Sequence, residues 1–282
     1  MAELDAVLAK VGDMSFRRRI LTTVEWLRGL PAGSRVRDAG CGEGFYEFAL
    51  TSALDLRVDG FDHDPRLIEQ ASAWLADEPR ASVRVGDIYA IDAEDNSFDA
   101  AVCSEVLEHL PDDRSAVAEI FRVLKPGGLF VASVPNANYP LAWDPLNWVR
   151  EHAGLGHFDP SNGWLGGIWA LDHQRLYTPQ QFEHLIRGPG FHIQETRALT
   201  RAGVPFNCMV LQVGKKLLSG PIAPESVKKA SEKFETEKPL GRRHPFAIAM
   251  QVLQTVDRRN DKTLPLNGPA LNVAVLAQKP PA

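Results

Sequence analysis

The chain has 282 residues, of which 44% are hydrophobic and 24% are charged. This is an ordinary globular composition, and it excludes a disordered chain, a collagen-like chain and a disulfide-stapled miniprotein. With 31 Lys and Arg against 36 Asp and Glu, the formal charge is −5, which gives no global attraction for nucleic acid or anionic membranes. The three widely spaced cysteines, Cys41, Cys103 and Cys208, predict reduced thiols in a cytoplasmic protein.

The first two thirds of the chain alternate short apolar runs with helical patterns, which is typical of βα units and a parallel sheet. A helical spacing of apolar residues predicts a helix over residues 15–30, ending near Gly29 and Pro31. The next predicted elements are a strand at 35–39, a helix at 45–54, a strand at 56–61, a helix opening at Pro65, strands at 81–85 and 96–103, a helix at 114–124 and a strand at 129–134. We expect no targeting segment, because the first residues carry early acids and no unbroken apolar run. No apolar stretch of roughly 18 residues predicts a membrane span.

The pattern changes after residue 135. Residues 136–175 hold four of the six tryptophans among Gly, Pro and His, a segment too long and irregular for a plain connection, so we expect a lid. Its tryptophans either wall an acceptor pocket or pack on the domain, and His152, His157 and Asp159 are read as surface or packing residues. Thr178 and Pro179 predict a helix start, and the remaining elements are strands at 191–199 and 271–277 with helical patches at 209–218 and 246–256.

These elements predict a single domain over 1–282. Its core covers 15–137, 176–203 and 268–279, interrupted by the lid insertion 138–175 and a second insertion, 204–267. Apolar and lysine-bearing stretches in the second insertion leave a weak peripheral membrane contact open, although packing with solvated lysines is the favoured interpretation. The oligomeric state is not predicted.

A glycine-rich loop follows the first predicted strand. Asp38, Gly40, Gly42 and Gly44 alternate between strand and helix, where glycine permits a sharp turn and brings backbone N–H groups close to a ligand. Asp62 and Asp87 follow the next two strands, and open α/β sheets bind ligands at the carboxyl ends of their strands. The alternative is a tight turn with helix-capping acids.

These residues resemble the class I S-adenosylmethionine-dependent methyltransferases. The resemblance implies an α/β fold with a Rossmann-like, doubly wound, seven-stranded sheet whose last strand is antiparallel and lies between the fifth and sixth. It also implies that the glycine loop lies beneath the methionine part, that Asp62 binds the ribose with His63 beside the adenine, and that Asp87 binds the adenine amino group while Ile88 packs on the ring. The implied cofactor residues are Asp38, Gly40, Gly42, Gly44, Asp62, His63, Asp87, Ile88 and Ser104.

A second motif, Ser104-Glu105-Val106-Leu107-Glu108-His109-Leu110, follows the fourth strand. If this segment is helical, Glu105, Glu108 and His109 share one face and could coordinate a divalent cation. The alternative is that its acids are solvated or cap a helix.

Adding His173, in Asp172-His173-Gln174-Arg175-Leu176-Tyr177-Thr178, the motif resembles two groups of metal-dependent O-methyltransferases. These are the small-RNA 2′-O-methyltransferases and the ubiquinone-biosynthesis O-methyltransferases. The resemblance implies Glu105, Glu108, His109 and His173 as ligands of Mg²⁺ or Mn²⁺; without metal, His109 or His173 could act as general base.

The expected activity is therefore methyl transfer from S-adenosylmethionine to a small-molecule acceptor, with the oxygen of a hydroxylated aromatic, sugar or lipid-like compound favoured. Three alternatives stay open: a metal-independent N-methyltransferase of a small amine, an RNA 2′-O-methyltransferase, which the acidic charge disfavours, and a catalytically silent cofactor-binding module.

Overall fold

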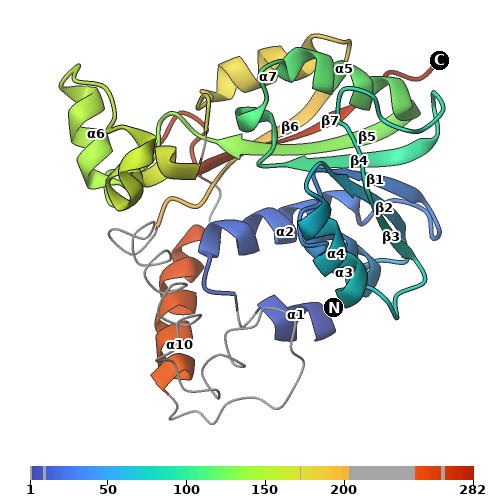
Figure 1. Cartoon of the computed structure of the whole chain (residues 1–282), viewed down its shortest axis with the longest axis horizontal. Coiled ribbons are helices and arrows are strands. Elements are labelled where there is room, and N and C mark those ends of the chain that lie inside the picture. The colour runs from blue at the N-terminus through green and yellow to red at the C-terminus, as the bar shows by residue number, and fades with distance from the viewer. Residues whose placement is uncertain (1, 9–10, 172, 203–244, 262–263) are drawn as a thin grey trace.

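A computed structural model of the protein describes residues 2–8, 11–171, 173–202, 245–261 and 264–282. Seven strands form one sheet in the order β3-β2-β1-β4-β5-β7-β6, with helices on both faces (Figure 1). β1 to β5 pair in parallel, and β7 runs antiparallel between β5 and β6, which confirms the predicted doubly wound sheet. The strands are β1 Arg35–Ala39, β2 Arg57–Asp62, β3 Ala81–Val85, β4 Phe98–Ser104, β5 Leu124–Pro135, β6 His192–Leu199 and β7 Asn272–Gln278.

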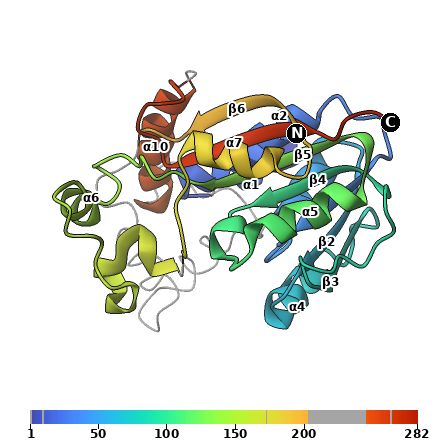
Figure 2. The same cartoon turned by 90° about the horizontal axis from the view of Figure 1, so that it is seen from above.

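Two hydrophobic cores lie on opposite faces of this sheet. Helices α1 (Ala2–Leu8), α2 (Met14–Leu27) and α3 (Phe45–Ala53) bury their apolar faces in one core, and α4 (Pro65–Trp74) lies beside α3. Helices α5 (Asp113–Val123) and α7 (Pro179–Arg187) close the other core and lie over the opposite face (Figure 2). β4, β5 and β7 are buried along most of their length and contain mainly apolar residues, as expected for strands covered on both faces.

Helix starts follow their capping residues. The Thr178 side chain and Gln181 form a capping box with Pro179 in the first turn of α7, as the sequence predicts. The Asp13 carboxylate accepts hydrogen bonds from the N–H groups of Ser15 and Phe16, so α2 begins one residue before the predicted position.

The predicted lid contains a helix, α6 (Pro145–His152), and a 3-10 segment, Pro160–Leu171, and α6 projects beyond one end of the sheet (Figure 1). A small core of Tyr139, Trp143, Ile168 and Leu271 supports the lid. The fully buried Asn147 amide donates to the carbonyls of Leu165 and Gly166. The excursion is therefore more ordered than the irregular segment expected from the sequence.

The second insertion is described only in part. α10 (Pro245–Asp257) confirms the predicted helical patch at 246–256, whereas the patch at 209–218 and Cys208 lie outside the described residues. Asp257 is buried and accepts from Arg17 Nη1 at 2.6 Å and Arg18 Nε at 2.9 Å, which fastens the end of α10 to α2. Within the part of the chain that the structure describes, no helix is long and apolar enough to cross a bilayer.

Candidate active site

The glycine loop joins β1 to α3 at the carboxyl edge of the sheet. Gly40, Gly42 and Gly44 have φ values of 87°, 54° and 82°, in the left-handed region that favours glycine. At Gly40 a Cβ atom would also lie 2.4 Å from Val106 Cγ2. Both the left-handed backbone and this contact therefore exclude a larger residue at position 40. The loop is fixed from β2, because the N–H groups of Gly40 and Cys41 both donate to the carbonyl oxygen of Phe61.

The three predicted acids lie at the carboxyl ends of adjacent strands. Asp38 is buried near the end of β1, and Asp62 ends β2, where its carboxylate accepts from the N–H groups of Gly42 and Asp64, both at 3.0 Å. Asp87 follows β3 by two residues; it is exposed and accepts from the N–H of Tyr89 at 2.9 Å. The order β3-β2-β1 therefore brings the three together at one edge, as the sequence predicts.

The two other residues expected to contact the adenine, His63 and Ile88, differ in their exposure to solvent. The His63 ring is exposed, and its Nδ1 lies 3.2 Å from Oδ1 of Asp62, the acid expected to bind ribose. Ile88 is buried in the core that α5 closes.

This edge fits an adenosyl ligand. Asp38 Oδ2 is buried and accepts no hydrogen bond from the described residues, and such an orphaned acceptor is normally satisfied by a partner. Burial, together with the nearby Asp62, raises the pKa of Asp38 to about 8. A bound donor group or cation would satisfy Asp38 and favour its ionised form.

One residue of this edge was missed by the sequence reasoning. Glu47, in the first turn of α3, is fully buried, and neither carboxyl oxygen has a hydrogen-bond partner among the described residues. The available signal was Gly60 inside β2, since a glycine within a strand often marks a close approach by another group.

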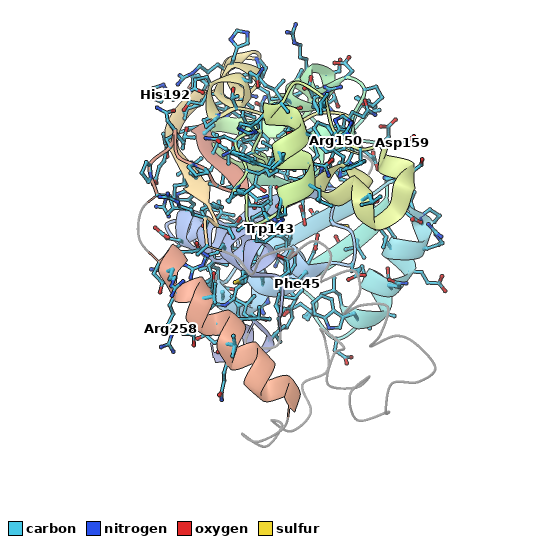
Figure 3. All side chains as sticks on the ribbon, turned by 90° about the vertical axis from the view of Figure 1, so that its left-hand side faces the viewer. Phe45, Trp143, Arg150, Asp159, His192 and Arg258 are labelled. Carbon is cyan, nitrogen blue, oxygen red and sulfur yellow. The ribbon has the colours of Figure 1, made fainter. Side chains whose placement is uncertain are left out.

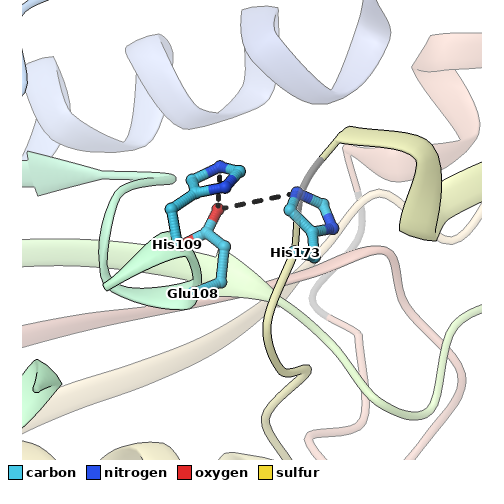
Figure 4. Close-up of side chains that lie close together, drawn as sticks. All are labelled: Glu108, His109 and His173. Atoms are coloured by element: carbon cyan, nitrogen blue, oxygen red, sulfur yellow. Dashed lines mark ion pairs between the residues drawn. The ribbon is translucent and has the colours of Figure 1, made fainter. Parts of the chain in front are cut away.

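Glu108, His109 and His173 form a cluster whose candidate ligand atoms all lie within 4.8 Å of one another (Figure 4). Glu108 Oε1 lies 3.7 Å from His109 Nε2 and 4.0 Å from His173 Nε2. These separations suit atoms that share an ion at about 2.0–2.2 Å from each. Both Glu108 carboxyl oxygens and His173 Nδ1 are buried and lack hydrogen-bond partners among the described residues, so the cluster fits a divalent cation.

Burial sets the protonation of the cluster. It raises the pKa of Glu108 well above its usual range, with the Glu105 carboxylate adding to the effect. It lowers the pKa of His173 to about 4, with His109 adding to the effect. His173 is therefore a neutral imidazole at neutral pH, the form that binds metals or accepts protons.

Hydrogen bonds from the residues after His173 bring it to Glu108. The Gln174 N–H donates to the Glu108 carbonyl at 2.9 Å, and the Gln174 side-chain amide donates to the His109 carbonyl at 2.8 Å. The Arg175 guanidinium pairs with Asp113 at 2.8 Å. The two segments, more than 60 residues apart in sequence, are thus joined through main-chain groups.

The segment 104–110 does not form the helix on which a shared face of Glu105, Glu108 and His109 would depend. Only Leu107–His109 forms a single 3-10 turn, and Glu105 has a φ of 57°, which breaks the segment before that turn. Glu105 therefore does not share a helix face with Glu108 and His109. Its carboxylate instead accepts from Ser133 Oγ at 3.1 Å and Asn272 Nδ2 at 2.7 Å, and Glu105 is not part of the described cluster.

Glu105 belongs to a hydrogen-bonded chain that crosses the same edge of the sheet. Tyr46 Oη donates to Ser104 Oγ, which lies 2.8 Å from Ser133 Oγ. At the other end Ser15 Oγ donates to Asn272 Oδ1, and Arg19 Nη1 donates to Ser15 Oγ, both at 2.5 Å. Arg19 also lies 3.5 Å from Glu105 Oε2. Ser104, expected to contact the cofactor, is thus the link between the glycine-loop helix and this chain.

In the lid, packing accounts for the described aromatic side chains. Trp143 is buried in the small lid core, and the Trp169 indole donates to Glu151. His152 stacks on Trp148 and His157 stacks on Trp169, and Asp159 accepts from Ser161. Figure 3 faces the lid and labels Trp143, Arg150 and Asp159 on it. These contacts support the packing interpretation of the residues.

Comparisons with known proteins agree with this geometry. Residues 37–132 match the family model described as "Methyltransferase domain". A Mycolicibacterium smegmatis protein named "Probable S-adenosylmethionine-dependent methyltransferase" is 32% identical over 165 residues, covering 58% of this chain and 54% of the relative. A ubiquinone biosynthesis O-methyltransferase of Neisseria meningitidis is 28% identical over 173 residues, covering 60% of this chain and 68% of the relative.

A solved structure of Haemonchus contortus phosphoethanolamine N-methyltransferase 2 with S-adenosyl-L-methionine matches 93% of this chain and 52% of that chain. Its TM-score is 0.54 at 19% identity, which shows a common fold. The match to the Mycolicibacterium protein spans only about half of that relative's length. Residues 37–132 of the chain are thus similar to a methyltransferase domain, and the whole sheet shares the fold of a solved methyltransferase.

Proposed function

We propose that the whole protein transfers a methyl group from S-adenosylmethionine to the hydroxyl oxygen of a small molecule, with a divalent cation held at Glu108, His109 and His173. The chain works as one domain in this proposal, with the donor over β1–β3 and the acceptor beside β4. The observation that carries it is the cluster of the buried Glu108 carboxyl group with the imidazoles of His173 and the partly exposed His109. It lies at the edge of the sheet where Asp38 and Asp62 also lie.

The arrangement suits the chemistry of methyl transfer. The sulfonium already has a good leaving group, so the enzyme's task is to place the acceptor in line and to activate it. A bound divalent cation would lower the pKa of a hydroxyl group that coordinates it. The neutral His173 ring and the Glu108 carboxylate hold their atoms toward the same point, where an acceptor proton could also be taken up.

The donor set narrows the choice of ion. Two imidazoles with one carboxylate suit transition-metal ions such as Mn²⁺ or Zn²⁺, whereas Mg²⁺ prefers oxygen ligands. We therefore favour Mn²⁺ over the Mg²⁺ that the sequence left equally open, and we assign Glu105 to the hydrogen-bonded chain and not to the ligand set.

The test is a transfer assay with methyl-labelled S-adenosylmethionine over panels of phenols, sugars and amines, run with Mn²⁺, Mg²⁺ or chelator. We expect labelled product from hydroxylated acceptors, a loss of at least about tenfold in chelator, and recovery with Mn²⁺. Glu108→Gln should remove Mn²⁺ binding measured by paramagnetic resonance, while the exposed control Glu69→Gln should keep it. Full turnover of an amine in chelator would instead establish the metal-independent N-methyltransferase.

A further inference from the structure

His173 reaches the proposed metal site from a segment that is remote in sequence. Glu108 and His109 lie on the 3-10 turn Leu107–His109, whereas His173 follows the 3-10 segment of the lid. The three side chains come from these two separate segments and meet between them (Figure 4). Only 6% of the His173 side chain is exposed. The position of this ring therefore depends on the contacts that tie the two segments together.

Residues 174–177, here called the strap, provide those contacts. At one end, Gln174 donates hydrogen bonds to the main-chain carbonyls of the two candidate ligands on the 3-10 turn. Leu176 packs against the small core of the lid. At the other end, Tyr177 is buried in the core that α5 closes. The strap therefore joins the lid to the turn that carries Glu108 and His109.

Asp113, in the first turn of α5, holds two side chains of the strap. Tyr177 Oη donates to Asp113 Oδ2 at 2.6 Å, and Arg175 Nη1 lies 2.8 Å from the same oxygen. Tyr177 Oη also lies 3.3 Å from the main-chain carbonyl of Leu107. Hydrogen bonds to a charged carboxylate are stronger than those between neutral groups, and the Asp113 side chain is only 16% exposed. One carboxylate thus fastens the strap four residues after His109.

We propose that Asp113 is a positioning residue of the proposed metal site: by holding the strap, it keeps the His173 imidazole against the other two candidate ligands. Asp113 is not a member of the described ligand cluster, so its effect on a bound ion passes through His173. The inference rests on the proposed function for the metal, whereas the placement of His173 is also measurable in metal-free protein.

Loss of the Asp113 charge should weaken metal binding although every ligand remains. Asp113→Asn keeps the size of the side chain but weakens its bonds to the two strap side chains. Groups that orient metal-binding histidines typically change metal affinity by 10–100-fold, and we expect Mn²⁺ to bind about tenfold more weakly to this variant.

Asp112→Asn is the matched control. The exposed Asp112 carboxylate accepts from Ser115 at the start of α5, and asparagine caps a helix as well as aspartate does. This variant removes the same charge one residue away, so it measures the general electrostatic attraction for a cation. We expect it to bind Mn²⁺ within about twofold of wild type, because an exposed charge is screened by solvent and salt.

The first test measures Mn²⁺ affinity by paramagnetic resonance in a double-mutant cycle. His173→Ala should itself weaken binding, and adding Asp113→Asn to it should change the affinity by less than about twofold, since two residues that act through one contact are not additive. An equal loss in Asp112→Asn, or a further loss of about tenfold when Asp113→Asn is added to His173→Ala, overturns the inference.

The second test measures the placement of His173 without metal. Chelated protein is treated with diethyl pyrocarbonate, and the rate of His173 modification is followed by peptide mass spectrometry. The buried ring should react slowly in wild type and in Asp112→Asn, and at least about fivefold faster in Asp113→Asn, because local opening exposes it. Tyr177→Phe removes one of the two bonds and keeps the buried ring, so its smaller increase provides the test if Asp113→Asn impairs folding.

The two tests separate failure of the inference from failure of the proposed function. An unchanged rate of His173 modification in folded Asp113→Asn and Tyr177→Phe overturns the positioning role. A wild-type protein in which His173 is protected but no Mn²⁺ binds instead overturns the metal in the proposed function.

Discussion

Glu105 shows how one residue can be assigned to two different sites. The sequence motif and its resemblance place it among metal ligands, yet its left-handed φ of 57° turns the chain before the 3-10 turn that carries Glu108 and His109. A non-glycine residue in this region carries strain of about 1 kcal/mol or more. Its N–H donates to the Ser133 carbonyl, and its carboxylate accepts from Ser133 and Asn272, so the surrounding contacts hold the strained conformation.

We expect Glu105→Ala to lower the free energy of unfolding by about 2–3 kcal/mol, because it removes these bonds and leaves the mostly buried Arg19 without its facing carboxylate. Glu105→Gly should lose less, by about 1 kcal/mol, since glycine adopts the left-handed backbone without strain. Urea denaturation followed by circular dichroism measures both. Mn²⁺ affinity should change by less than about threefold in Glu105→Ala but collapse in Glu108→Ala; equal losses in the two would return Glu105 to the ligand set.

The site residues that could be predicted from the sequence are those that lie in a recognisable local pattern. The glycine loop and the acids after β1, β2 and β3 follow from strand ends and glycine spacing. Glu47 was missed because a glutamate near a helix start usually faces solvent, and only the register partner of Asp38, Gly60, reveals that it turns inward. The conditional helix face shared by Glu105, Glu108 and His109 does not form, because the backbone of Glu105, with a φ of 57°, ends the helical pattern before Glu108.

Ion pairs between helix α2 and the buried Asp257 connect helix α10 of the second insertion to the carboxyl edge of the sheet. The three consecutive arginines of α2 have different partners. Arg17 and Arg18 pair with Asp257 at the end of α10. Arg19 instead contacts Ser15 and Glu105. Asn260 adds a second anchor, accepting from the N–H groups of Arg201 and Ala202. Helix α2 therefore links the position of α10 to the polar chain at the edge of the sheet.

Asp257→Ala should loosen α10 while the sheet stays folded. The substitution leaves two arginines without their buried partner, so we expect a local loss of about 2–4 kcal/mol and faster hydrogen exchange over residues 245–257, read by mass spectrometry. Asp261→Ala removes a contact to Arg18 from a largely exposed carboxylate and should change little. Unchanged exchange in the Asp257 variant would show that α10 is held by other contacts.

The strand elements were the most predictable part of the fold, and the lid the least. Strands such as 35–39 and 81–85 match their predicted bounds, because turn-forming residues such as Gly33, Gly40 and Gly86 flank them. The lid helix α6 was not predicted, since it depends on tertiary contacts: buried Asn147 joins it to residues 165 and 166, and Leu271, over 100 residues later, completes its core.

At the scale of the whole molecule, acids with raised and lowered pKa values act on stability in different pH ranges. Hydrogen bonds from Arg197 and Arg122 lower the pKa values of Glu25 and Glu119, so their contribution is lost only as the pH falls below about 4. Burial raises the pKa values of Asp38, Glu47 and Glu108. Between about pH 4 and 8 the folded chain therefore holds more protons than the unfolded chain, and its stability falls as the pH rises.

The ligand-free, chelated protein should thus be most stable in mild acid. We expect its Tm to be at least about 5 °C lower at pH 8.5 than at pH 5.5, because ionising these buried acids costs more than about 1–2 kcal/mol in a protein of this size. Differential scanning calorimetry over pH 5 to 9 measures the change. Glu47→Gln should flatten the decline, whereas Glu69→Gln should reproduce it. A Tm that rises steadily toward pH 8.5 without ligand would mean that these acids are not buried as protonated groups.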